Sequence, residues 1–182
     1  ANQWDNDAAN PADTWLAGST NVLRGCGMPA NTWVFSRDAW HALIHNSRIR
    51  SHFGDRAGVL SPSDIAALLA TITVPEEAQA SFDMRVFISA AQQNTANEGQ
   101  TGSAKEILLN HAWCGYIERG SPGLMNPSAL YSYEVAPVAA ETYDEDGIDS
   151  DVWRAKEICG EQIPLAAAGH RFTSPVGSPA IS

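Results

Sequence analysis

The sequence has few cysteines and few basic residues, and it has no long hydrophobic run. Its 3 cysteines among 182 residues are widely separated and odd in number, which favours buried thiols in a reducing compartment and excludes a dense disulfide framework. Against 21 Asp and Glu there are 11 Lys and Arg, and the net charge of −10 argues against wrapping the nucleic-acid backbone. No apolar run approaches the roughly 20 residues that cross a bilayer. We therefore expect no membrane segment, and the N-terminal residues do not have the pattern of a signal peptide.

Motifs of common enzyme classes are also missing. There is no G-x-S-x-G, no P-loop and no dinucleotide-binding fingerprint. His41 and His45 are one helical turn apart and could bind zinc, but the metalloprotease pattern needs Glu directly after the first histidine, where this chain has Ala42. His111 and Cys114 are three apart in one expected strand, so they point to opposite faces and cannot easily form a nucleophilic pair.

An acidic run, ETYDEDGIDSD, occupies residues 141–151. Its aspartates could supply oxygen ligands to calcium: Asp144, Asp146, Asp149 and Asp151. The calcium-loop pattern wants glycine at the sixth position, however, and Gly147 is the fourth residue from Asp144. A solvated acidic loop is the simpler interpretation. We expect no enzyme activity, with no catalytic, cofactor-binding or metal-binding residue and no cofactor, and keep a metal-dependent enzyme using His41 and His45 only as an alternative.

Hydrophobic periodicity predicts an α+β fold. Helix patterns with start signals cover residues 11–26, about 37–46, and 61–72. In the first of these, the expected apolar stripe consists of Trp15, Leu16, Ser19, Val22, Leu23 and Cys26. Strand patterns cover residues 31–36, 82–89, 106–118, 128–136 and 151–165. The polar stretch 92–103 between two of these strands is too long for a tight hairpin turn.

Several segments, in order, resemble the major capsid proteins of tailed bacteriophages. They are NTWVFSRDAWHALIHNSRIRSHFGD (31–55), GVLSPSDIAALL (58–69), NTANEGQT (94–101) and GLMNPSALYSY (123–133). The order and spacing agree over about residues 1–172. The resemblance implies the HK97-like coat protein fold, of which this chain would be the C-terminal portion. On this resemblance, we expect this chain to lack the N-terminal arm and the extended loop that precede the spine helix in such proteins.

The resemblance also implies a division of the chain. Residues 1–30 would form part of the peripheral domain with the spine helix, and residues 31–137 mostly the axial domain. Residues 138–172 would return to the peripheral domain, and residues 173–182 would be a tail.

A function follows from the same resemblance. The chain would be a structural subunit of an icosahedral phage capsid, assembled in the host bacterial cytoplasm and found in the virion. Its partners would be other copies of itself in pentamers and hexamers, with scaffold, portal or decoration proteins as further partners and at most weak contact with packaged DNA. Residues expected at a subunit contact are Asn94, Asn97, Glu98, Gly99 and Gln100. The shell of an encapsulin-like nanocompartment is the alternative within the same fold.

Overall fold

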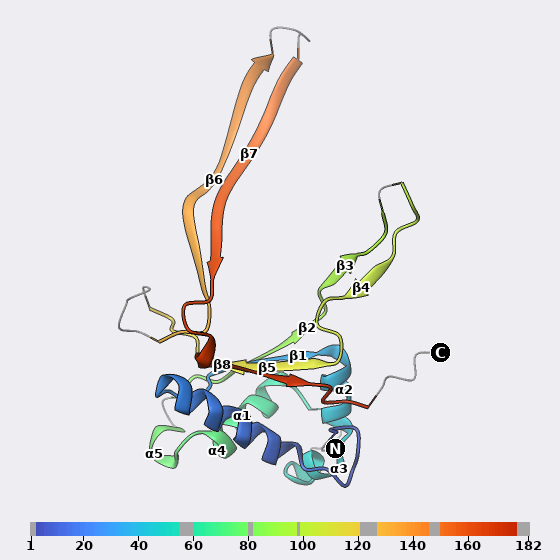
Figure 1. Ribbon diagram of the computed structural model, residues 1–182, viewed down its shortest axis with the longest axis vertical. Helices are drawn as coiled ribbons and strands as arrows, with labels where there is room; N and C mark the ends of the chain where they lie inside the picture. The colour runs from blue at the N-terminus through green and yellow to red at the C-terminus, as the bar shows by residue number, and fades with distance from the viewer. Residues whose placement is uncertain are drawn as a thin grey trace.

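A computed structural model describes residues 3–54, 60–79, 82–97, 99–120, 127–145 and 150–177. The body is a four-stranded sheet with helices on one face, and two β-hairpins rise from the other side (Figure 1). The helices are α1 (Pro11–Cys26), α2 (Arg37–His45), α3 (Ser47–Ser51), α4 (Pro62–Thr73), α5 (Glu76–Gln79) and the 3₁₀ helix η2 (Ala166–Ala168). The strands are β1 (Thr32–Ser36), β2 (Arg85–Ser89), β3 (Gln92–Asn94), β4 (Ala104–Glu106), β5 (His111–Gly115), β6 (Tyr131–Glu145), β7 (Ser150–Gln162) and β8 (Gly169–Thr173). The expectation of an α+β fold is confirmed.

Local capping explains where the helices begin and end. Ser36 accepts a hydrogen bond from the Ala39 backbone N–H and starts α2. Ser61 and Asp64 form a reciprocal capping box at the start of α4. Pro62, directly after the cap residue Ser61, occupies the first helical position. Gly27 ends α1 with a left-handed φ of 77°. Among the helices of the described residues, none is long and apolar enough to span a membrane.

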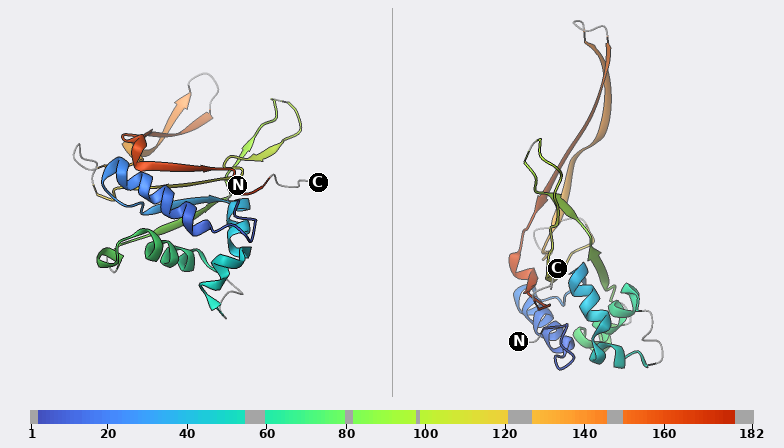
Figure 2. Two further views of the ribbon diagram at one scale, coloured as in Figure 1. Left: turned by 60° about the horizontal axis from the view of Figure 1, so that its bottom comes forward. Right: turned by 90° about the vertical axis from the view of Figure 1, so that its right-hand side faces the viewer.

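The central sheet has the strand order β2-β1-β5-β8. β1 runs parallel to β2 and antiparallel to β5, and β5 runs antiparallel to β8. The parallel pair is possible because the chain between β1 and β2 passes through α2, α3 and α4. Figures 1 and 2 show the α-helices gathered on one face of this sheet, which leaves the opposite face without α-helices.

An aromatic cluster fills the core between the sheet and the helices. The rings of Trp33 and Phe172 stack with centroids 5.8 Å apart. Trp15 meets Trp33 edge-on, and Trp4 meets Trp15 and Phe35 edge-on. Trp4, Trp15, Trp33 and Phe35 are each at most 1% exposed. Trp4 is fixed by its backbone N–H, which donates to the carbonyl of Pro175 at 2.6 Å, so the two ends of the described chain meet at the core.

Helix α1 packs closely on β8 and η2, with a narrower buried stripe than predicted. Trp15, Ser19 and Val22 are buried as expected, but Leu16 and Leu23 are 49% and 44% exposed, so the predicted apolar stripe is too wide. Two glycines make the close approach possible. A methyl group at Gly18 would lie within 3.0 Å of the Phe172 ring, and one at Gly25 within 3.0 Å of the Ala167 backbone, because the helix contacts β8 and η2 there.

The predicted strand over residues 106–118 is wrong. It divides into the end of β4, a turn over residues 107–110, and β5. Asn110 has a left-handed φ of 47°, and its side-chain amide exchanges two hydrogen bonds with the backbone of Val176. The tertiary partner of Asn110 therefore stabilises a turn within an apolar stretch. The strand β8 is absent from the prediction, and residues 175–177 of the predicted tail are hydrogen-bonded to the body.

The long hairpin formed by β6 and β7 is the largest feature outside the body. These two segments were predicted as separate strands, and the structure pairs them in a register that runs from Tyr131↔Gln162 to Glu145↔Ser150. Register shifts lie on both sides of Ala136, next to Pro137, where a bulge tolerates a residue without an N–H. β7 ends before Pro164, as predicted. The predicted domain boundary at residue 137 falls within β6, and the assignment of domains stays a prediction.

Candidate functional site

The predicted contact residues lie at the end of the shorter hairpin. β3 and β4 pair from Gln92↔Glu106 to Asn94↔Ala104 and carry the polar stretch away from the body (Figure 1). Asn97, Gly99 and Gln100 are exposed at its end, whereas Glu98 lies outside the described residues. The hairpin itself was not predicted, because strands of three residues give too short a pattern to detect.

Asn94 has a structural role in this hairpin. Its side-chain oxygen accepts hydrogen bonds from the backbone N–H groups of Ala96 at 3.0 Å and Ser103 at 3.1 Å. The Gln100 N–H donates to the Asn97 carbonyl, and Gly99 takes the left-handed φ of 80° that the turn requires. The end of the hairpin is thus an organised turn. That Asn97 and Gln100 contact a neighbouring subunit stays a prediction.

The sheet face without α-helices carries a row of side chains that crosses all four strands and is hydrophobic on three of them. The register places Phe87, Val34, Trp113 and Arg171 side by side on β2, β1, β5 and β8. Trp33 and Phe35 alternate with Val34 and face the core instead. A methyl group at Gly115 would lie within 3.0 Å of the Trp113 ring, so the sheet needs glycine there for the indole to lie over it.

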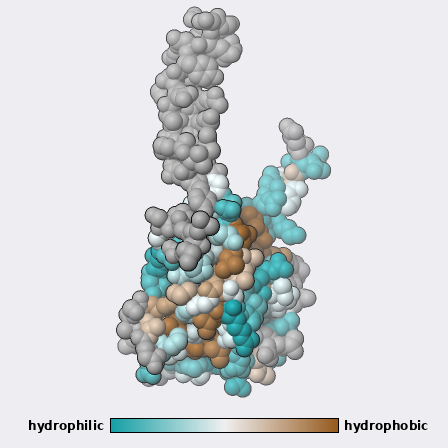
Figure 3. All heavy atoms as spheres, turned by 60° about the vertical axis from the view of Figure 1, so that its left-hand side comes forward, coloured by the Kyte–Doolittle hydropathy of each residue, from teal (hydrophilic) through white to brown (hydrophobic). Residues whose placement is uncertain are grey.

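A hollow of about 570 Å³ lies over this row, and we call it the open-face hollow. It is lined by Thr32, Val34, Phe87, Trp113, Ile117, Ala129, Leu130, Ile163, Ala166, Gly169 and Arg171. Several of its apolar members face solvent: Phe87 is 50% exposed, Leu130 40% and Ile163 67%. Figure 3 shows hydrophobic residues reaching the surface between the feet of the two hairpins. Exposed apolar groups gathered in this way are typical of a surface that contacts another molecule.

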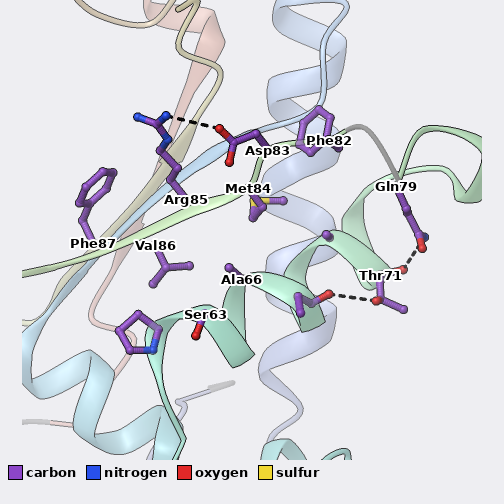
Figure 4. A pocket seen from close by; sticks show the side chains of 13 residues that line it. Ser63, Ala66, Thr71, Gln79, Phe82, Asp83, Met84, Arg85, Val86 and Phe87 are labelled. Carbon is purple, nitrogen blue, oxygen red and sulfur yellow. Dashed lines mark hydrogen bonds and ion pairs between the residues drawn. The ribbon is translucent and has the colours of Figure 1, made fainter.

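A second hollow of about 810 Å³ lies between α4 and β2 (Figure 4). Ala66 and Ala70 form part of its α4 wall, and β2 is an edge strand of the sheet. Asp83, next to β2, is ion-paired with Arg119 and lies 3.4 Å from Arg85. The small side chains of these alanines leave the space between α4 and β2 open, and the groove follows a strand edge that is unpaired among the described strands.

The two histidine hypotheses can be placed in the structure. The rings of His41 and His45 lie with centroids 4.4 Å apart on the exposed side of α2. Within the described part of the chain, no group of three His, Cys, Asp or Glu side chains is arranged to hold a metal ion. Cys114 is fully buried in the core, and burial raises the pKa of its thiol, which opposes thiolate formation. His111 is only partly buried, on the same strand.

The acidic run lies at the far end of the long hairpin. Glu141, Asp144 and Glu145 belong to β6 and Asp151 to β7, and Asp144 is the register partner of Asp151. Asp146 and Asp149, which the calcium hypothesis also needs, lie outside the described residues. The backbone of the long hairpin extends away from the body (Figure 2).

Comparison with known proteins gives a fold likeness. No family model and no curated protein matches the chain. Among solved structures, it is similar to a phage-related protein from Bordetella bronchiseptica RB50, with a TM-score of 0.72 and 16% sequence identity. The match covers 95% of this chain and 52% of that protein, so the chain spans about half the length of the neighbour. The α+β body with its hairpins is thus a fold that also occurs in a phage-related protein.

Proposed function

We propose that this chain is part of the major coat protein of a tailed bacteriophage. It has the HK97-like fold, assembles with other copies of itself into pentamers and hexamers, and resides in the virion shell around the genome. Its role is structural, with no catalysis. The fold likeness to a phage-related protein and the sequence resemblance to coat proteins support this proposal from two directions.

The observation that carries the proposal is that the long hairpin and the apolar hollow beside it are uncovered in the isolated chain as the structure describes it. A two-stranded hairpin is marginally stable in water by itself, and β6 and β7 pair only with each other among the described strands. The open-face hollow beside them exposes Phe87, Leu130 and Ile163. Both features are explained if neighbouring subunits cover them, since repeated contacts between copies then stabilise each subunit.

The β3–β4 hairpin supports the same role through polar contacts. Asn97 and Gln100 are exposed donors and acceptors on an organised turn. Contacts of this kind hold water and are individually weak, which allows a misplaced subunit to dissociate during assembly. Subunit interfaces that repeat head-to-tail close into the rings that a shell requires.

The test is to express the complete gene product that contains this chain and to image it by negative-stain electron microscopy. Closed particles of uniform size are expected, and packaged DNA in place of an enzyme cargo separates a virion from a nanocompartment. Phe87→Asp should prevent closure by placing a charge in the open-face hollow, whereas Asn21→Asp, on the exposed side of α1, should not. Small discrete particles alone, even with the neighbouring phage genes supplied, would refute the proposal.

A further inference from the structure

Strand β2 has one edge without a partner strand. It is the first strand in the order β2-β1-β5-β8, and β1 pairs with its other edge. The Arg85 N–H donates to the Asn31 carbonyl on that paired side at 2.8 Å. Because the backbone groups of successive strand residues point alternately to the two sides, those of Val86 and Ile88 point to the free edge. Within the described part of the chain, no residue forms a hydrogen bond with them there.

The side chains at this edge are apolar and exposed on both faces of the sheet. Natural edge strands are usually protected from further pairing by proline, a bulge or several charges. β2 contains no proline, pairs with β1 without a register shift and carries one charged residue, Arg85, at its start. Phe87 is 50% exposed on the open face, and Ile88, aligned with the core residue Phe35, is 37% exposed on the helix face. A strand added at the free edge would cover both side chains.

The hollow of about 810 Å³ between α4 and β2 leaves space beneath such a strand, and we call it the α4–β2 groove. Ala66 and Ala70 line it on α4, and Val86 lines it on β2 (Figure 4). Alternate side chains of an added strand would point towards α4, where these small residues leave them room.

The α4–β2 groove favours a strand that has no helix beneath it. β8 is the other edge of the sheet, and α1 packs against it, with Gly18 next to Phe172. If the sheet continued into β8 of a second copy with the helices on the same side, α1 of that copy would meet α4. A hairpin without helices avoids this collision.

The long hairpin supplies a strand of this kind. β6 and β7 pair only with each other among the described strands, and no helix lies along them in Figures 1 and 2. β6 contains Pro137, which has no N–H, and both register shifts add a residue to β6 and none to β7. β7 contains no proline, so its free edge is the uninterrupted one. A third strand would also stabilise the hairpin, since two strands alone are marginally stable in water.

The free edges of β2 and β7 meet only between copies. In Figures 1 and 2 the hairpin extends away from the sheet that contains β2, and the two strands do not pair within one chain. The outer part of β7, residues 150–155, is farthest from its own body, and it is long enough to span the 5 residues of β2. A contact between them joins two different surfaces, so it is head-to-tail and closes into rings or extends into arrays.

We infer that the outer part of β7 in one copy adds to the free edge of β2 in a second copy, over the α4–β2 groove. Main-chain hydrogen bonds to Val86 and Ile88 give this contact its affinity, as in other cases of strand addition. The inference rests on the proposed function, for which it names one of the repeated contacts between subunits. Another extended segment is the competing occupant of the free edge, and shortening the hairpin separates the two.

Hydrogen exchange in the full chain tests the contact at single residues. Exchange proceeds at low and at high protein concentration, and NMR reads each backbone amide after the associated state is dissolved. We expect association to slow exchange at Val86 and Ile88 by at least about tenfold, because their N–H groups gain an acceptor. Arg85 and Phe87 are internal controls, since their N–H groups already point to β1.

Two substitutions at one position separate the backbone from the side chain. Ile88→Pro removes an N–H that points away from β1, a position where an edge strand tolerates proline. We expect it to weaken self-association, measured by sedimentation velocity, at least about tenfold. Ile88→Ala truncates the same side chain and keeps the N–H, so its loss should be clearly smaller. Protection at Arg85 and Phe87 reports whether β2 of the proline variant still pairs with β1.

A shortened hairpin identifies the occupant. Ala139 and Lys156 are register partners, so residues 140–155 can be replaced by Asn-Gly, which forms a two-residue hairpin turn. We expect this variant to lose the slower exchange at Val86 and Ile88 at high concentration. Slow exchange that persists assigns the free edge of β2 to a different segment and overturns the inference.

The remaining outcomes also decide for or against the contact. Unchanged exchange at Val86 and Ile88, equal losses in Ile88→Pro and Ile88→Ala, or no self-association of the wild type overturns it. Closed shells from a complete gene product that carries Ile88→Pro overturn the contact and leave the proposed function standing. Slower exchange at the free edge on association, with no shells from the complete gene product, supports the contact and refutes the proposed function.

Discussion

Substituting Gly25 by alanine tests whether the close approach of α1 to η2 is essential. Gly25 is in the last turn of α1, where alanine would be favoured by about 1 kcal/mol from helix propensity alone. The added methyl group would lie 2.8 Å from the carbonyl carbon of Ala167 and 2.9 Å from its Cβ, and closest to its oxygen. These atoms are mainly backbone, so η2 and the start of β8 must move with them.

The magnitude follows from these two opposing effects. Overpacking of this kind costs about 1–3 kcal/mol, and the gain in propensity offsets up to about 1 kcal/mol of it. We expect Gly25→Ala to lower the free energy of unfolding by about 1–2 kcal/mol. With a urea m-value of about 2 kcal/mol/M, the midpoint should fall by roughly 0.5–1 M.

Urea unfolding followed by circular dichroism measures this shift. Asn21→Ala is the matched control, because Asn21 lies on the exposed side of the same helix and its replacement should leave the midpoint equal or slightly raised. If Gly25→Ala raises the midpoint by the same or a greater amount, propensity dominates. The close contact between α1 and η2 would then have no energetic role.

Three further predictions address the helix cap, the open face and the partly buried His170. Ser61→Ala should destabilise the protein by about 1 kcal/mol in urea unfolding, since the capping box with Asp64 is lost, and no shift would contradict the cap. Gly115→Ala should displace the Trp113 ring, costing about 1–3 kcal/mol and changing near-ultraviolet circular dichroism; an unchanged spectrum would argue against the close contact. Burial lowers the pKa of His170 from 6.5, so the unfolded chain binds this proton more readily and stability falls as the pH drops below about 6.5. The urea midpoint should therefore fall less between pH 7.5 and 5.5 in His170→Gln than in the wild type, and an equal fall in both would refute this cause.

The candidate contact surfaces depend mostly on tertiary structure. The sequence predicted a subunit contact at Asn94, Asn97, Glu98, Gly99 and Gln100. All of these except Glu98, which lies outside the described residues, are exposed, and their role in a contact stays a prediction. The open-face hollow was not predicted, because Val34, Phe87 and Trp113 look like ordinary strand residues until the register places them in one row. No local pattern distinguishes the covered face of a sheet from its open face.

The sequence alone determined the elements whose causes are local. Ser36, Ser61 and Gly27 delimit helices through hydrogen bonds or backbone angles within a few residues, so their signals can be found in a short window. Only the tertiary structure decided that Trp4 enters the core and that β6 pairs with β7. These outcomes depend on partners far along the chain, such as Pro175 for Trp4, and a pattern of neighbouring residues carries no information about a distant partner.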